Sequence, residues 1–399
     1  MKKVLFLGCM YPHDRLEELN INSITSIDYA ANNLQWALVK GLDYFYPDMQ
    51  IITLPAIQSF PLKYKKFRFK ESKFSHNINS DDLCLGFVNF PILKHFSRYY
   101  SIKKKINEIF RYQNEVLIII YSIQTPFLAA IKAIIKSGKK IKVCLIVPDL
   151  PQYMSDNTNH IYLFLKKIDI IMIKKLIVNV NYFVFLTQHM AKALHVENKP
   201  NVTIEGIFDP LISFQTSRPK QQKTILYTGT LAQRYGILYL LEAFSKIKDR
   251  EYKLWICGDG DTNEIIKEAA KTDSRILFMG LKPHKEILEL QQCASVLVNP
   301  RTSEGEFTKY SFPSKTMEYL ASGTPTVLFK LEGIPNEYFK HCFVVEEETI
   351  DALKNTIIEV CEMDEKLRLD IGLKAKSFIF EKKNPKIQCE KIIKMLDKI

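Results

Sequence analysis

The stretch YSFPSKTMEYLASGTPTVL, residues Tyr310–Leu328, combines a helix start, a helix stop and a second apolar run. Ser311 is a good N-cap residue, and the proline two positions later is tolerated in the first turn of a helix. We therefore predict a helix over Ser314–Ser322 that ends at Gly323, and then a strand over Thr326–Phe329. A helix that leads back into a buried strand is the repeating unit of an α/β fold.

The start of this helix offers chemistry as well as structure. Its free backbone amides and partial positive charge make a ready site for a diphosphate. Arg301 and Lys315 could add formal charge, and the Glu318 carboxylate could accept two hydrogen bonds from the vicinal hydroxyls of a ribose. The alternative is an ordinary helix capped by Ser311, with Glu318 paired to Lys315 three residues earlier.

The same alternation of apolar strands and helices runs through most of the chain. Val116–Tyr121 reads VLIIIY, which is typical of a strand buried on both faces of a parallel sheet. A chain of 399 residues is too long for one ordinary core, so we predict two Rossmann-like α/β domains. The other predicted strands are Val4–Gly8, Gln50–Leu54, Lys142–Val147, Tyr182–Leu186, Thr224–Thr228, Tyr252–Cys257, Ile276–Phe278 and Ser295–Asn299. The other predicted helices are Asp28–Leu42, Pro126–Lys136, Ile161–Val178, Gly236–Ile247, Asn263–Thr272, His284–Gln292, Ile350–Glu362 and Lys386–Lys398.

A break in this pattern sets the predicted domain boundaries. Residues 209–223 are polar, contain two prolines and lack periodicity, so we predict a linker there. The N-terminal domain would span residues 1–208 and the C-terminal domain residues 224–380, while residues 381–399 would form a helix that packs back on the N-terminal domain. Ligands of such sheets bind outside the carboxyl ends of the strands, which makes the loops after the strands candidate sites.

Several motifs now match a known family. Asn299-Pro300-Arg301, followed by Phe312–Val327, resembles the donor-binding signature of the GT-B glycosyltransferases of family GT4. Other segments resemble further parts of that family in the right order, and the resemblance is good over residues 182–330. These segments are Phe185–Gln188, Ile204–Asp209, Tyr227–Leu231 with Gly236, Trp255–Gly260 and Phe278–Leu281.

The resemblance implies a GT-B fold with a deep interdomain cleft, in which a sugar passes from a nucleotide-sugar to an acceptor without a metal ion and usually with retention of configuration. The C-terminal domain would hold the donor: Glu318 the ribose, the amides near Phe312–Ser314 the diphosphate, and Leu281 the base. The predicted donor-binding residues are Gly229, Thr230, Arg234, Gly258, Gly260, Leu281, Arg301, Tyr310, Ser311, Phe312, Pro313, Ser314, Lys315 and Glu318. The predicted catalytic residues are Asp149, Lys315 and Glu318, and the predicted acceptor-side residues are Gly8, His13 and Asp149.

The sequence also departs from the family pattern. Tyr310 stands where the family often has a second glutamate, and Thr230 and Tyr235 stand where it has a phosphate-binding arginine and lysine. Arg234, Arg301 or Lys315 could replace that lost charge. On the acceptor side, the usual His-Asp pair is Pro148-Asp149; Asp149 could act on the acceptor hydroxyl, or be an ordinary loop carboxylate.

The charge of the chain is one-sided. The net charge is +12, and residues 1–208 hold 27 basic against 16 acidic residues, a balance of +11. Three basic stretches, Lys63–Lys70, Ser101–Lys105 and Lys139–Lys142, belong to this half. We expect them to contact an anionic membrane surface and a lipid-diphosphate-linked acceptor, although an ordinary solvated lysine-rich face is the alternative. Nucleic acid is disfavoured because no RNA-binding module is recognisable.

Together these features predict an enzyme, a hexosyltransferase-type glycosyltransferase that uses a nucleotide-sugar, in the first place a UDP-sugar. The acceptor would be a saccharide or lipid-linked saccharide in the biosynthesis of a surface polysaccharide, such as an exopolysaccharide or capsule. The alternatives are a sugar-nucleotide epimerase or phosphorylase of the same fold, or a non-enzymatic basic binding protein.

No cofactor is expected, and the eight scattered cysteines are interpreted as reduced thiols rather than metal ligands. No stretch of about 18 uncharged apolar residues occurs, so we predict a cytoplasmic protein, peripheral on the inner face of the membrane.

Overall fold

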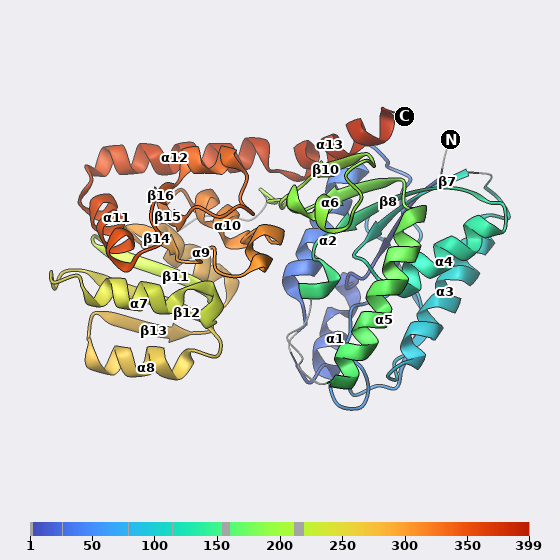
Figure 1. Ribbon diagram of the computed structural model, residues 1–399, viewed down its shortest axis with the longest axis horizontal. Helices are drawn as coiled ribbons and strands as arrows, with labels where there is room; N and C mark the ends of the chain where they lie inside the picture. The colour runs from blue at the N-terminus through green and yellow to red at the C-terminus, as the bar shows by residue number, and fades with distance from the viewer. Residues whose placement is uncertain are drawn as a thin grey trace. The chain divides into compact units, whose positions relative to one another are not determined.

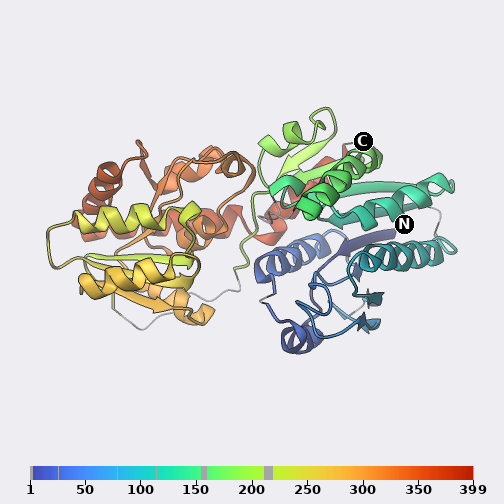
Figure 2. The ribbon, with the colours of Figure 1, turned by 60° about the horizontal axis from the view of Figure 1, so that its bottom comes forward.

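The computed structural model describes residues 3–25, 27–78, 80–113, 115–153, 160–210 and 219–398. The chain divides into two units (Figure 1, Figure 2). Unit 1 comprises Met1–Ile207 and Pro385–Ile399, and unit 2 comprises Phe208–Asn384. Most of the predicted linker, residues 211–218, lies outside the described residues. In both units a parallel sheet carries helices on its two faces, which confirms the predicted pair of Rossmann-like sheets.

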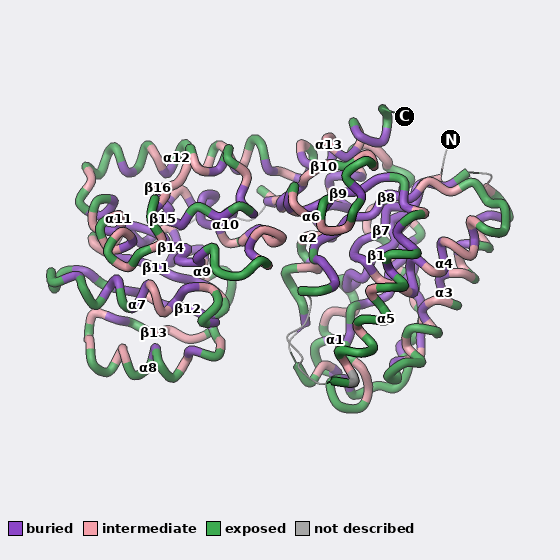
Figure 3. Tube along the Cα trace, viewed as in Figure 1, coloured by how far each residue is buried: buried purple, intermediate pink, exposed green. Residues whose placement is uncertain are grey.

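Unit 1 is built on a sheet of strand order β10-β9-β8-β7-β1-β2-β5-β4, in which only β4 runs antiparallel to its neighbour. Its strands are β1 (Lys3–Gly8), β2 (Gln50–Thr53), β4 (Ser72–Phe74), β5 (Asp82–Cys84), β7 (Glu115–Tyr121), β8 (Lys140–Val147), β9 (Tyr182–Phe185) and β10 (Asn201–Thr203). Two short strands, β3 (Arg68–Phe69) and β6 (Phe87–Val88), pair separately. The central strands are buried on both faces, as the apolar run of β7 predicts (Figure 3).

Helices from distant parts of the chain cover the sheet of unit 1. These helices are α1 (Leu16–Asn22), α2 (Tyr29–Asp43), α3 (Leu93–Ile109), α4 (Thr125–Lys136), α5 (His160–Leu176), α6 (His189–Ala193) and α13 (Pro385–Asp397). The last of them packs on α2: the Cys389 thiol donates to the Leu38 carbonyl at 3.4 Å, and Ile392 is fully buried in the core of this unit. A Cβ added to Gly41 of α2 would lie only 2.3 Å from the Pro385 carbonyl oxygen, so this approach requires glycine.

Unit 2 has a fully parallel sheet of order β13-β12-β11-β14-β15-β16. Its strands are β11 (Thr224–Thr230), β12 (Lys253–Asp259), β13 (Ile276–Gly280), β14 (Val296–Asn299), β15 (Thr326–Phe329) and β16 (Phe343–Val345). Its helices are α7 (Ile237–Ser245), α8 (Asn263–Thr272), α9 (His284–Cys293), α10 (Ser314–Ser322), α11 (Ile350–Glu362) and α12 (Glu365–Lys382). The chain builds outward from β11 to β13, then returns to place β14 beside β11. The sheet therefore reverses its strand order between β11 and β14.

The predicted strands and helices are confirmed, and their ends move by no more than two residues. Two long helices, α3 and α12, were not predicted. The buried stripe of α12 consists of Arg368, Gly372, Ala375 and Ile379, so its helical spacing is present but only half of it is strongly apolar. The stripe of α3 likewise begins with a buried Arg98.

Candidate functional site

The loops at the carboxyl ends of β11, β12 and β14 approach one another very closely. Gly229 has a φ of 137°, and a Cβ there would lie 1.0 Å from the Lys315 Nζ. Gly258 has a φ of 149°, and its Cβ would lie 1.7 Å from the Gly229 carbonyl oxygen. A Cβ on Gly260 would meet the Leu231 carbonyl oxygen at 2.2 Å. These glycines allow the loop after β11 to lie against the loop after β12 on one side and directly beside the start of α10 on the other.

Lys315 occupies the space that Gly229 leaves free. Its Nζ lies 5.1 Å from the centre of the Tyr227 ring. Burial lowers the pKa of Lys315 to about 8, although the nearby Glu318 carboxylate opposes this shift. A half-buried ammonium at the first turn of a helix, at the point where strand order reverses, is well placed to receive an anion.

Glu318 is held by two side chains of α9. Its carboxylate oxygens lie 2.9 Å from the His284 Nε2 and 2.6 Å from the Gln291 Nε2. Burial alone would raise the pKa of Glu318, but the hydrogen bonds from His284 and Gln291 hold it below its usual range. Glu318 is therefore an ionised, oriented acceptor, and His284 and Gln291 replace the pairing with Lys315 that was the alternative interpretation. His284 and Gln291 were not predicted as site residues, although their spacing of seven places them on one face of α9.

Arg301 leaves the end of β14 and is 5% exposed. Its guanidinium lies 4.8 Å from the Phe307 ring centre and 5.5 Å from that of Tyr235, and its Nη2 donates to the Ser311 hydroxyl at 2.7 Å. Its Nε has no hydrogen-bond partner among the described residues, and burial lowers the pKa of Arg301. The predicted N-cap role of Ser311 is wrong: Pro313 holds the cap position of α10 and has no side-chain cap, because the Ser311 hydroxyl bonds to Arg301.

The other predicted donor residues differ in what they can offer a ligand. Thr230 and Arg234 are exposed, with the Arg234 guanidinium 5.1 Å from the Tyr235 ring centre. Leu281 is 75% exposed after β13, as a residue that flanks a base would be. Phe312 is buried against Tyr338, so only its backbone could meet a ligand. Tyr310 ends the 3₁₀ segment Glu306–Tyr310, Pro313 holds the cap position of α10, and Ser314 is the first residue of that helix.

The predicted acceptor-side residues all belong to unit 1. Gly8 ends β1, where a Cβ would lie 2.8 Å from the Gln35 Oε1. The His13 ring stacks on Trp36 with the ring centres 4.3 Å apart, which favours a structural role. Asp149 follows β8, and crowding by protein atoms together with the charge of Asp28 raises its pKa. The strand ends thus bring polar groups to the carboxyl edge of this sheet.

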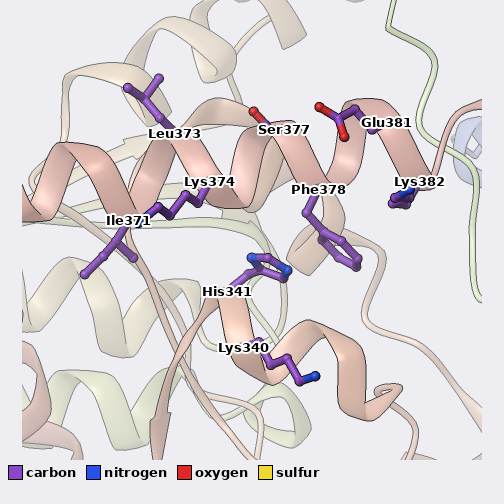
Figure 4. Close-up of a pocket in the computed structure, with 9 residues that line it drawn as sticks. All are labelled: Lys340, His341, Ile371, Leu373, Lys374, Ser377, Phe378, Glu381 and Lys382. Carbon is purple, nitrogen blue, oxygen red and sulfur yellow. The ribbon is translucent and has the colours of Figure 1, made fainter.

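Two further observations concern other parts of the surface. A shallow pocket of about 550 Å³ lies between the 3₁₀ segment Asn336–His341 and α12, where the His341 ring stacks on Phe378 at 4.3 Å (Figure 4). No predicted site residue lines it. Within the described ranges, no helix is both long and apolar enough to cross a membrane, and no cluster of three or more His, Cys, Asp or Glu side chains could hold a metal ion.

Two parallel α/β units, with a helix start at the switch point of the second, define a fold of the GT-B type. Residues 209–378 match the family model described as Glycosyl transferases group 1, which confirms the resemblance found in the motifs. The fold is similar to that of the Anabaena protein HepE in complex with UDP, with a TM-score of 0.65 and 14% sequence identity; the match covers 100% of each chain.

Curated relatives match part of the chain. The chain is 31% identical over 161 residues to an uncharacterized glycosyltransferase of Methanocaldococcus jannaschii, a match that covers 36% of this chain and 40% of that protein. It is 27% identical over 128 residues to the D-inositol 3-phosphate glycosyltransferase of Corynebacterium glutamicum, which covers 29% of each chain. The matched region thus spans less than half the length of these relatives. Their names agree with the predicted enzyme class.

Proposed function

We propose that this protein is a glycosyltransferase that takes a sugar from a nucleotide-sugar and passes it to a saccharide acceptor. The observation that carries the proposal is the ionised Glu318, held by two α9 side chains one turn from Lys315 at the start of α10. In a bound nucleoside diphosphate, the Glu318 carboxylate would accept hydrogen bonds from the ribose hydroxyls, and the Lys315 ammonium would pair with the diphosphate. The UDP bound to HepE supports a UDP-sugar as the donor.

The proposed diphosphate site compensates for two missing cations. Thr230 and Tyr235 stand where the resembled family has arginine and lysine, and neither carries a positive charge. Lys315 beside Gly229 and Arg301 on the next loop supply charge from α10 and from the end of β14 instead. Charge that develops on the leaving diphosphate would be stabilised by these groups and by the first amides of α10. Retention of configuration without a metal ion is part of the same proposal.

Replacement of Glu318 tests the donor site. Glu318→Ala removes two hydrogen bonds to hydroxyls, each worth about 1.5–3 kcal/mol when one partner is charged, so kcat/KM should fall at least about a hundredfold. Glu286→Ala, on the exposed face of α9, is the matched control and should keep wild-type transfer. Undiminished turnover in Glu318→Ala would refute the assignment.

A thermal-shift screen against UDP-, GDP-, ADP- and CMP-sugars names the donor. A nucleotide that binds only the native state raises the unfolding temperature in proportion to its occupancy. We expect UDP-sugars to give the largest shift. A free, altered sugar-nucleotide as the reaction product would indicate an epimerase instead.

The proposed acceptor is a lipid-diphosphate-linked saccharide in the biosynthesis of a surface polysaccharide, with the protein bound peripherally to the inner face of the membrane. The surface of α5 supports this, because apolar side chains that are 38–63% exposed alternate there with lysines. The exposed apolar residues are Leu163, Phe164, Leu165, Ile168, Ile171 and Met172. Lysines interleaved with apolar side chains suit an anionic lipid surface.

Vesicle binding tests this part of the proposal. The wild type should sediment with phosphatidylglycerol vesicles and remain free of phosphatidylcholine vesicles. The double variant Phe164→Ser, Ile168→Ser should lose most of that binding, whereas Leu373→Ser, an exposed apolar residue of unit 2, should not. Equal binding by all three proteins would exclude α5 as the membrane contact.

A further inference from the structure

Two of the basic stretches in the first half of the sequence meet at one groove in unit 1. The groove has a volume of about 630 Å³ and lies between the β3–β6 pair and the face of α3. Arg68 and Lys70 come from the first stretch, and Lys104 and Lys105 from the second. On α3 the lining residues run from Ser97 to Glu108, which is about 16 Å of helix.

The floor of this groove is fixed by hydrogen bonds and ring packing. The Ser97 hydroxyl accepts from the Val88 amide at 2.9 Å, and the Ser101 hydroxyl donates to the Gly86 carbonyl at 2.8 Å. Beneath them Phe69 and Phe87 stack with their ring centres 5.4 Å apart, and each is 2% exposed. The floor of the groove is therefore formed by the fold, and charged side chains line the groove around it.

The charge of the lining is positive and partly unbalanced. Lys105 pairs with Glu108 at 3.2 Å. Arg68, Lys70 and Lys104 are exposed and form no ion pair with any residue that the structure describes, while Glu71 contributes one further negative charge. Three unpaired cations against one carboxylate, spread along an elongated floor, favour an extended anionic ligand over a single small ion.

The position and chemistry of the groove favour a saccharide chain over the other polyanions. Leu85 and Gly86 line the groove and directly follow β5, so the groove reaches the carboxyl edge of the sheet, where ligands of such sheets bind. Single-stranded nucleic acid is held by a series of exposed aromatic rings on which successive bases stack. Among the rings that line the groove only Phe67 is exposed, whereas Phe69 and Phe87 are buried. A membrane surface is nearly flat on this scale, so it would contact the rim of the groove and not its floor.

We propose that this groove binds an anionic linear saccharide, the growing part of the acceptor, with Arg68, Lys70 and Lys104 paired to its carboxylate or phosphate groups. The inference rests on the proposed glycosyltransferase function and names the class of acceptor. The reacting end of the chain lies toward the carboxyl edge of the sheet in unit 1, and the body of the chain follows α3.

Direct binding measurements on the full chain test the proposal. The probes are linear oligosaccharides of a uronic acid, dextran oligosaccharides of matched length, oligo-dT and phosphatidylglycerol vesicles. The variant combines Arg68→Ala, Lys70→Ala and Lys104→Ala. The control combines Lys136→Ala, Lys139→Ala and Lys140→Ala, which removes three exposed charges elsewhere in unit 1.

We expect the uronic acid chains to bind the wild type in a salt-sensitive manner and dextran not to bind. The groove variant should bind them about tenfold more weakly, since exposed ion pairs are individually weak and screened by salt, and the control should change less than about twofold. The proposal would be overturned if both variants lost binding equally, or if uronic acid chains did not bind the wild type. It would also be overturned if the groove variant lost binding only to oligo-dT or only to vesicles.

The UDP-induced thermal shift is recorded on the same samples. If UDP binds and uronic acid chains do not, the groove assignment fails and the proposed function stands. If the chains bind at the groove and no nucleotide binds, the groove assignment stands and the proposed function fails.

Discussion

Among single residues, the proposed diphosphate site depends most on the charge of Lys315. Because burial lowers the pKa of Lys315 to about 8, its ammonium is lost as the pH rises through that value. The affinity for UDP should therefore fall above about pH 8, by up to about tenfold per pH unit. Calorimetric titrations of UDP across this range measure the effect. Lys315→Gln should bind UDP weakly with a flat pH profile, and a wild-type affinity that stays constant would contradict the prediction.

A second residue ties the edge of the unit 1 sheet to α2. The His76 side chain is 1% exposed, with Nδ1 2.6 Å from the Asp82 Oδ2 and Nε2 3.0 Å from the Asp43 Oδ1. Burial lowers the pKa of His76, but hydrogen bonds to Asp43 and Asp82 raise it to about 9. A raised pKa means that the stabilisation is fully present below the ordinary value near 6.5 and is lost as the pH rises through about 9.

The consequence can be measured by urea unfolding at pH values on either side of this window. The wild type should lose at most about 3 kcal/mol of unfolding free energy between neutral pH and about pH 10. His76→Gln should be less stable at neutral pH and should lack that drop. Parallel pH profiles of the two proteins would show that the ion pairs of His76 do not stabilise the fold.

Among the elements, whether the sequence predicts a helix depends on its boundary residues and on whether its buried face is a continuous apolar stripe. Ser314–Ser322 was predicted to the residue because a strand, a proline and a glycine bound it. The helix α12 was missed because Arg368 and Gly372 interrupt its apolar stripe. In the site, Glu318 followed from its place on one helix. Its partners His284 and Gln291 could not be predicted, because their contact with Glu318 depends on how α9 and α10 pack, and no local pattern encodes that packing.

The packing of α12 on α10 gives a test at this scale. A Cβ on Gly372 would lie 2.0 Å from the Gly323 carbonyl oxygen, a backbone atom that cannot rotate away. Gly372→Ala should destabilise unit 2 by about 1–3 kcal/mol, despite the higher helix propensity of alanine. Leu373→Ala, on the exposed face of the same helix, should change stability by less than about 0.5 kcal/mol. Denaturant unfolding measures both, and equal stability of the two variants would contradict the close approach.

For the whole molecule, the chain completes unit 1 only after it has built unit 2. The chain leaves unit 1 after Ile207, builds unit 2, and returns at Pro385 to complete unit 1 with α13. The core of unit 1 includes Cys389 and Ile392 from this last helix. The sheet of unit 1 therefore lacks part of its cover until Pro385–Asp397 has been made.

A charge in the core of α13 should separate the two units thermodynamically. Ile392→Asp buries a carboxylate without a partner in a fully buried position of unit 1, at a cost of about 3–5 kcal/mol. Lys398→Asp adds the same group at an exposed position and is the control. In calorimetry of the Ile392 variant, the transition of unit 1 should fall by many degrees. The transition of unit 2 should stay in place and still rise with UDP, because only unit 2 is proposed to bind it. If both transitions moved together, the units would unfold as one cooperative body, and the independence of their cores would be wrong.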